Sequence, residues 1–166
     1  MEAAGTPPEL SDFWRIDADT LRVTPGQASR FAKEIAGDWN PIHDPGGRRF
    51  CVPGDLLFAV VLQRYGLSQR MRFRFESMLT EGRTLQLPAA ADNSGGLRLV
   101  DDRGSCVLAV EGAQQPCLDA AVIDRFVRSY VGFSGRNFPH FLRPLMAEQG
   151  VMFNLERPLV IYDRMG

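Results

Sequence analysis

Residues 37–43 read Gly37-Asp38-Trp39-Asn40-Pro41-Ile42-His43 and place a carboxylate and an imidazole on either side of an Asn-Pro break. On a continuous helix, Asp38 and His43 would lie about 140° apart and therefore on different faces. Pro41 lacks an N–H and biases Asn40 away from helical backbone angles, so the chain is expected to turn between the two groups. Such a turn can bring both side chains to one point, where a carboxylate and an imidazole form a general acid/base pair.

A helix is predicted on each side of this stretch. Before it, Thr24-Pro25-Gly26-Gln27 supplies an N-cap hydroxyl, a proline at the first helical position and a glutamine three residues after the cap. Gly37 suits the end of that helix. After it, a second helix is expected to open at Val52-Pro53-Gly54-Asp55 and to end near Tyr65-Gly66. Residues 56–62 are apolar on almost every side, which predicts a helix buried on most of its faces.

Alternating sequence predicts antiparallel strands after the second helix. Residues 70–76 place Met71, Phe73 and Phe75 on one face and arginines on the other. Further strands are expected at 84–87, 97–100 and 106–110, with turn residues at 93–96 and 101–104.

Pro116 marks a predicted boundary between a domain at 1–116, which includes a polar leader at 1–11, and a C-terminal helical extension at 117–166. In the extension we expect a helix at 118–131, a second helix at 141–149 and a strand at 159–162. The first of these helices is expected to face the core with Leu118, Val122, Phe126 and Val127.

Composition excludes several classes of protein. The 166 residues carry a net charge of −1 and are 45% hydrophobic, which suits one globular domain and gives no argument for nucleic acid or a membrane as partner. Three cysteines and two histidines lack metal-like spacing, so neither a disulfide framework, a metal site nor a cofactor is expected. No signal peptide or membrane span is visible, and the cytoplasm is the expected compartment.

Residues 37–43 resemble the signature of the MaoC-like, (R)-specific enoyl-CoA hydratases, G-D-x-N-P-[hydrophobic]-H, at all six specified positions. The resemblance implies an α+β hot-dog fold, in which an antiparallel sheet wraps one long central helix, and a homodimer. It implies reversible hydration of trans-2-enoyl thioesters, or dehydration of (R)-3-hydroxyacyl thioesters, carried by coenzyme A or an acyl carrier protein. Asp38 and His43 would be the catalytic pair, with Asn40 and Pro41 supporting the loop.

Two further groups would complete such a site. Gly54 opens the second helix, where unpaired N–H groups and the helix dipole could stabilise a thioester oxygen. Arg70, Arg72 and Arg74 form a basic stripe that could bind coenzyme A phosphates or an acidic carrier protein. A glycine serves a tight turn equally well, and alternating arginines are more often the solvated face of a sheet.

The sequence departs from the hydratase pattern at Cys51-Val52-Pro53-Gly54-Asp55, where the histidine that usually precedes the glycine is missing. Asp55 adds a carboxylate that could block or repurpose the pocket. The alternative is therefore a non-catalytic hot-dog module that binds acyl-CoA or a protein partner through residues 117–166. A site filled by Trp39, Phe50 or Asp55 would favour it. A thioesterase is a third possibility, and the simplest is that the motif is only a helix stop with a surface His43.

Overall fold

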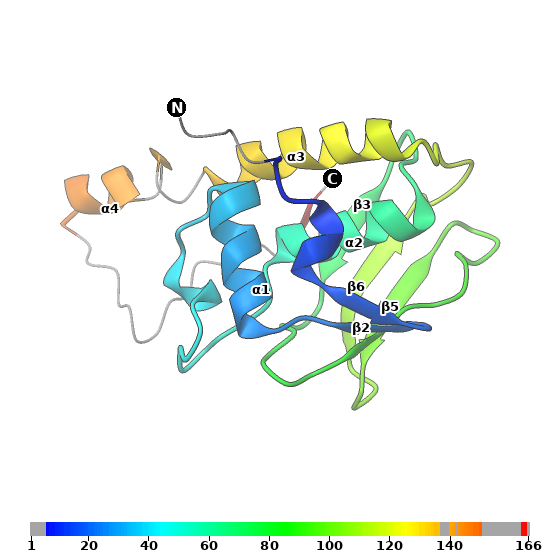
Figure 1. Ribbon diagram of the computed structural model, residues 1–166, viewed down its shortest axis with the longest axis horizontal. Helices are drawn as coiled ribbons and strands as arrows, with labels where there is room; N and C mark the ends of the chain where they lie inside the picture. Colours follow the sequence, from blue (N-terminus) through cyan, green and yellow to red (C-terminus); the bar gives the residue numbers. More distant parts are fainter. Residues whose placement is uncertain (1–5, 137–139, 142, 151–163, 166) are drawn as a thin grey trace.

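The computed structural model describes residues 6–136, 140–141, 143–150 and 164–165, which form an α+β fold (Figure 1). An antiparallel sheet lies on one side and the helices on the other, as the α+β part of the fold prediction required. The elements are η1 (Leu10–Phe13), β1 (Arg15–Asp17), β2 (Thr20–Arg22), α1 (Pro25–Arg30), η2 (Phe31–Ala36), η3 (Pro41–His43), α2 (Gly54–Tyr65), β3 (Arg72–Phe75), β4 (Leu85–Gln86), β5 (Leu97–Asp101), β6 (Cys106–Glu111), α3 (Ala120–Gly135), α4 (Arg143–Glu148) and β7 (Arg164–Met165).

The sheet has the order β1-β2-β4-β5-β6-β3-β7, and every neighbouring pair is antiparallel. The strands expected within 70–76, 84–87, 97–100 and 106–110 all form, although β4 is only two residues long. Phe73 of β3 pairs with Val110 of β6 and is buried, so the predicted inward face of β3 is confirmed at this residue.

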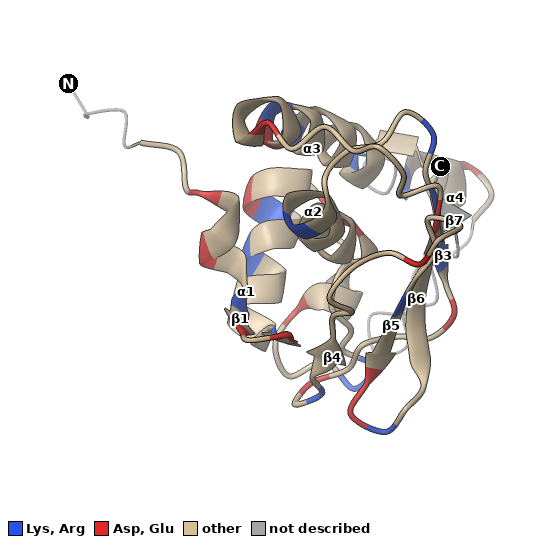
Figure 2. Cartoon of the chain, turned by 90° about the vertical axis from the view of Figure 1, so that its right-hand side faces the viewer, with Lys and Arg blue, Asp and Glu red and all other residues tan. Residues whose placement is uncertain are grey.

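Helix α2 is the buried centre of the molecule. The sheet curves around one side of it, while α1 and α3 close the others (Figure 2). The prediction of a helix without a polar face is confirmed, because no residue from 56 to 62 is more than 4% exposed. Each large apolar side chain buried in this way contributes about 1.5–3 kcal/mol relative to exposure.

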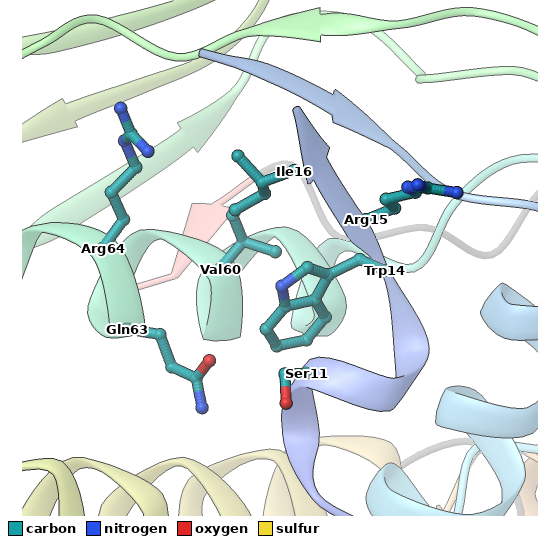
Figure 3. Close-up of a pocket in the computed structure, with 7 residues that line it drawn as sticks. All are labelled: Ser11, Trp14, Arg15, Ile16, Val60, Gln63 and Arg64. Atoms are coloured by element: carbon teal, nitrogen blue, oxygen red, sulfur yellow. The ribbon is translucent and has the colours of Figure 1, made fainter. Parts of the chain in front are cut away.

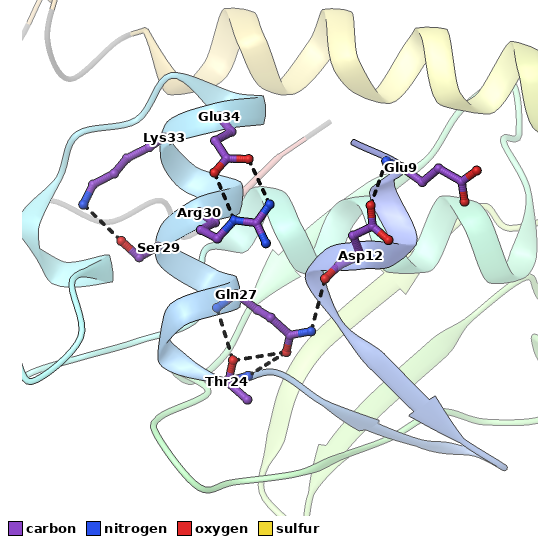
Figure 4. Close-up of polar contacts among 8 residues, drawn as sticks. All are labelled: Glu9, Asp12, Thr24, Gln27, Ser29, Arg30, Lys33 and Glu34. Carbon is purple, nitrogen blue, oxygen red and sulfur yellow. Dashed lines mark hydrogen bonds and ion pairs between the residues drawn. The ribbon is translucent and has the colours of Figure 1, made fainter. Parts of the chain in front are cut away.

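The helix before the motif begins and ends as predicted. Thr24 Oγ1 accepts the Gln27 N–H (3.2 Å), and the Thr24 N–H donates to Gln27 Oε1 (3.0 Å), which completes a capping box (Figure 4). Gln27 also donates to the backbone oxygen of Asp12, so the helix start is tied to η1. The last turn, η2, is a π-helix that ends at Gly37 in the left-handed conformation, with φ at 66°. A π-turn with a left-handed cap fixes the direction in which the chain leaves the helix.

Helix α3 packs on α2 and η2 with a different face from the predicted one. Its buried apolar residues are Ile123, Val127 and Val131, so only Val127 was placed correctly. The other three residues assigned to the core are exposed, at 70% for Leu118, 36% for Val122 and 38% for Phe126. Both sets recur about every four residues, and spacing alone does not choose between two apolar stripes on one helix.

The end of the chain is described only in part. Helix α4 lies within the helix expected at 141–149, whereas the strand expected at 159–162 falls outside the described residues. A boundary at residue 116 stays a prediction. In the described part of the chain, no helix has the length and apolar character needed to cross a membrane.

Candidate acid/base site

The turn that carries the site is built from two successive caps. The Asp38 N–H donates to the Ala32 backbone oxygen (2.7 Å), which closes the π-turn before it. Asn40 then caps η3, because its Oδ1 accepts the Ile42 N–H (3.1 Å), and Pro41 occupies the first position of η3. Pro41 therefore does what the sequence required of it, since the chain turns between the carboxylate and the imidazole.

Asp38 and His43 converge at this turn, with His43 Nε2 3.4 Å from Asp38 Oδ2. Each residue is 8% exposed. Asp38 Oδ1 accepts the Asn40 N–H (2.9 Å), and His43 Nδ1 lies 2.8 Å from the Cys51 backbone oxygen. The simplest alternative, a surface histidine beside a helix stop, does not fit a buried imidazole. The catalytic role of the pair stays a prediction.

The surroundings of His43 favour its charged form. Burial by itself lowers the pKa of the imidazole, but the contacts with Asp38 and Cys51 outweigh burial and raise the pKa to about 10. The geometry gives the same direction, because a carbonyl oxygen and a carboxylate oxygen each face one ring nitrogen. These contacts favour the imidazolium form of His43, in which both ring nitrogens carry a proton.

A second carboxyl group, Asp55, belongs to the same site. It is 3% exposed, and its side chain is hydrogen-bonded to Ser134 of α3. Burial raises the pKa of Asp55 to about 7, with Ser134 lowering it, the charge of Asp38 raising it and the charge of His43 lowering it. We refer to Asp38, His43 and Asp55 as the buried polar cluster. Within the described residues, no three metal-ligating side chains are arranged to share a metal ion.

Gly54 is the first residue of α2, next to the cluster. Its N–H has no carbonyl one turn earlier to bind within the helix, as at any helix start. The ring of Phe75 covers its Cα, and a Cβ at this position would lie 3.0 Å from Phe75 Cζ. The glycine allows the Phe75 ring to pack closely on the start of α2. Its role in binding an oxyanion stays a prediction.

The three predicted substrate-binding arginines are exposed, whereas the cluster is buried. Arg72 and Arg74 are on the outer face of β3, with side chains 70% and 47% exposed, and Arg70 precedes the strand. Arg74 pairs with Glu76 (3.5 Å), and both strand arginines lie 4.0 Å from Glu111. Neighbouring glutamates therefore offset part of the positive charge of the stripe.

Two grooves lie elsewhere on the surface. One, of about 370 Å³, follows the loop between His43 and α2 and is lined by Gly47, Arg48, Arg49, Phe50, Met78, Thr80 and Glu81. The other, of about 440 Å³, lies between β1 and the carboxyl half of α2 (Figure 3) and is lined by Ser11, Trp14, Arg15, Ile16, Val60, Gln63 and Arg64. The first groove places arginines next to the loop that carries the site.

Ser134 is the site residue that the sequence reasoning missed. It follows Ile123, Val127 and Val131 along the buried face of α3, and it is 7% exposed. The sequence could have indicated Ser134, because its hydroxyl lies on the same helix face as the buried apolar residues and a buried polar group needs a hydrogen-bond partner. That signal could be used only with the correct face of α3, which the sequence reasoning misplaced.

Comparison with known proteins corrects the proposed family. Residues 9–166 match the family model described as "Protein of unknown function (DUF3581)". No curated protein and no solved structure matches the chain. The resemblance to MaoC-like, (R)-specific enoyl-CoA hydratases is therefore wrong as a family assignment, because the family model that matches across the chain is a different one. The six shared positions are a local match confined to one turn.

Proposed function

We propose that this chain, which belongs to the DUF3581 family of unknown function, is an acid/base enzyme that reversibly hydrates trans-2-enoyl thioesters. The observation that carries the proposal is the buried contact between His43 Nε2 and Asp38 Oδ2, held by backbone hydrogen bonds on both residues. A buried and oriented carboxylate–imidazolium pair suits proton transfer, since one group accepts a proton while the other donates one.

The hydration step can be written with both groups. The Asp38 carboxylate takes a proton from water while the water oxygen bonds to the β-carbon, and the double-bond electrons move onto the thioester oxygen. As that enolate collapses, the His43 imidazolium gives its Nε2 proton to the α-carbon. The proton on Asp38 then passes to His43 across their 3.4 Å contact, which restores the resting pair. Dehydration of the (R)-3-hydroxyacyl thioester is the reverse sequence.

The enolate oxygen needs hydrogen-bond donors, and the start of α2 offers them. The Gly54 N–H is unpaired within the helix and lies at the positive end of the helix dipole. Arg48 and Arg49 line the groove beside the His43 loop and are exposed. Their charge supports a substrate with phosphate groups, such as a thioester of coenzyme A or of an acyl carrier protein.

The same proposal includes the finer description of the fold. A long antiparallel sheet curved around the buried α2 supports a hot-dog arrangement, and a homodimer is proposed with it. Sedimentation of the purified chain would test the dimer separately from the activity.

The direct test is turnover of a short and a medium trans-2-enoyl-CoA, followed by the loss of enoyl absorbance. Asp38→Asn and His43→Ala are expected to reduce kcat at least 10³-fold, because each removes one of the two proton-transfer groups. The matched control is Asp44→Asn, which removes a carboxylate on the same loop that pairs with Lys33 outside the cluster. Wild-type protein without turnover on either substrate would contradict the proposal.

A second function, a non-catalytic module that binds acyl-CoA or a protein partner, is favoured by one observation. Asp55 fills the start of α2, and Phe75 covers Gly54, so the oxyanion position is crowded. Trp39, by contrast, is 58% exposed and does not fill the site. Calorimetric binding of an acyl-CoA by a chain that does not turn it over would support this second function.

A further inference from the structure

We propose that Asp55 is a third catalytic residue of the site, a neutral carboxylic acid that donates a hydrogen bond to the substrate's carbonyl oxygen as negative charge develops there. The inference rests on the proposed function, since it assigns a donor for the oxyanion of that reaction. The sequence alone showed Asp55 only as an extra carboxylate that departs from the hydratase pattern.

The first argument is the state of the two Asp55 oxygens. The side chain is hydrogen-bonded to Ser134, yet Oδ1 has no hydrogen-bond partner among the described residues, although it is fully buried. A buried oxygen without a partner is costly in a folded protein unless something else satisfies it. If Oδ1 carries the acid proton, it can donate a hydrogen bond to a bound substrate oxygen, and this bond would remove that cost.

The second argument is the total charge of the buried polar cluster. Asp38 as a carboxylate and His43 as an imidazolium sum to zero, so an ionised Asp55 would leave a net negative charge in a buried space. A protonated Asp55 leaves the cluster neutral and turns this carboxyl group from an acceptor into a donor. Burial and the nearby Asp38 charge also raise the pKa of Asp55 to about 7.

The third argument is position. Asp55 follows Gly54 directly, so it lies in the first turn of α2, next in sequence to the residue whose N–H is proposed to bind the same oxygen. The titratable groups that face it are Asp38 after η2 and His43 of η3, while α3 contributes the uncharged Ser134. From β3, the ring of Phe75 covers the neighbouring Gly54. A donor acid next to a helix start and a general acid/base pair form a complete set for enolate chemistry.

The competing interpretation is that Asp55 only ties α2 to α3 through Ser134. Three variants separate the two roles. Asp55→Asn keeps a hydrogen-bond donor and removes the ionisation, Asp55→Leu removes the polar group at similar volume, and Ser134→Ala removes the tie and keeps the acid. If Asp55 has only a structural role, all three variants should change the stability, and none should change the shape of the pH profile of kcat.

The experiment is the pH profile of kcat for a trans-2-enoyl-CoA from pH 5 to 9, with urea unfolding of each variant. We expect wild-type kcat to fall above pH 7, Asp55→Asn to remain within tenfold of wild type at pH 6 without that fall, and Asp55→Leu to lose 10²- to 10³-fold while folded. Ser134→Ala is expected to keep the fall of kcat at high pH, because it keeps the Asp55 acid. A folded Asp55→Leu with wild-type kcat, or an Asp55→Asn that keeps the fall above pH 7, would overturn the inference.

A measurement that needs no turnover accompanies the kinetics. Infrared difference spectra of the wild-type chain should show a carboxylic-acid band that disappears as the pH passes 7 and that is missing from Asp55→Asn. An absent band would refute the neutral acid. Wild-type protein that shows the band but no turnover would instead contradict the proposed function, so the two failures are distinguishable.

Discussion

The two ends of α2 carry charge in different ways. At its amino end, Asp38, His43 and Asp55 are each at most 8% exposed. At its carboxyl end, Arg64 pairs with Asp19 with side chains 25% and 57% exposed, beside the groove of Figure 3. Charges at the first end interact in a low-dielectric surrounding, whereas water and salt screen those at the second. The two large pKa changes, at His43 and Asp55, therefore lie at the first end, which is the end proposed to carry the chemistry.

The glycines at the two ends of α2 also differ in what surrounds them. Gly54 begins α2 under the ring of Phe75, whereas Gly66 follows its last turn with φ at 88°. A Cβ on Gly66 would lie 2.7 Å from the Cys117 backbone oxygen, which cannot move as a side chain does. At the carboxyl end, Gly66 is required by the positive φ and by the nearby backbone, whereas at the amino end Gly54 lies against a side chain that can move.

The largest expected effect comes from removing the positive charge at the amino end. His43→Ala leaves the buried Asp38 carboxylate without its partner, and breaking a buried ion pair on one side costs about 3–5 kcal/mol. Urea unfolding at pH 7 measures this loss, with Asp44→Asn as the control on the same loop. A loss below 1 kcal/mol would show that His43 is uncharged or solvated and that the amino end of α2 does not hold a buried ion pair.

The next largest effects are expected from alanine at the two glycines, where one variant should lower stability and the other should lower turnover. Gly66→Ala is expected to cost about 2–3 kcal/mol, because alanine rarely adopts a positive φ and would clash with the backbone. Gly54→Ala should stay within about 1 kcal/mol, since alanine favours a helix and the Phe75 ring can shift, but it should lower kcat at least tenfold. Equal effects of both variants on kcat, normalised to folded protein, would remove the distinction between the ends.

An effect of similar size is the pH dependence of stability contributed by Asp55. Its pKa is raised from 3.8 to about 7, so the folded state binds more protons between those pH values. This contribution is fully present below pH 3.8 and is lost as the pH rises through 7. The free energy of unfolding should fall by about 2–3 kcal/mol more for wild type than for Asp55→Asn between pH 5 and 7.5. Parallel pH profiles of the two proteins would contradict the assignment.

The smallest effect is expected at the carboxyl end. Asp19→Asn removes the partner of Arg64 in a pair that is partly exposed, and such pairs contribute about 0–1 kcal/mol. Both the unfolding midpoint in urea and kcat should remain close to the wild-type values. A loss above 2 kcal/mol would mean that the two ends of α2 do not differ in the way that exposure indicates.

Local signals predicted much of the fold. Three predictions that rest on local sequence are confirmed. They are the capped start of the first helix, the buried helix over the apolar run of α2, and the strand over the alternating residues of β3. The face of α3 was wrong because Phe126 and Ile123 belong to competing apolar stripes. Phe126 instead stacks on Tyr130 (5.8 Å), which stacks on Phe58 of α2 (4.8 Å), an arrangement that no spacing in the sequence specifies.

The candidate site shows why a short motif did not identify the family. Gly37 adopts the left-handed cap, Asn40 caps η3, and Pro41 starts it, so three of the shared positions are explained by helix ending and starting alone. Any chain that must present a buried Asp and His at such a break has reason to use these residues. The contribution of Ser134 depends on tertiary packing, which lies beyond a seven-residue window.

The amino end of α2 is tested most directly by measuring the protonation state of His43. The measurement is ¹⁵N NMR of the imidazole nitrogens from pH 5 to 10. The chain has only two histidines, so His140→Gln leaves a single ring to assign. With a pKa near 10, both ring nitrogens should remain protonated at pH 8. In Asp38→Asn the proton should be lost at lower pH. A His43 ring with one deprotonated nitrogen at pH 7 in the folded wild-type chain would contradict the account.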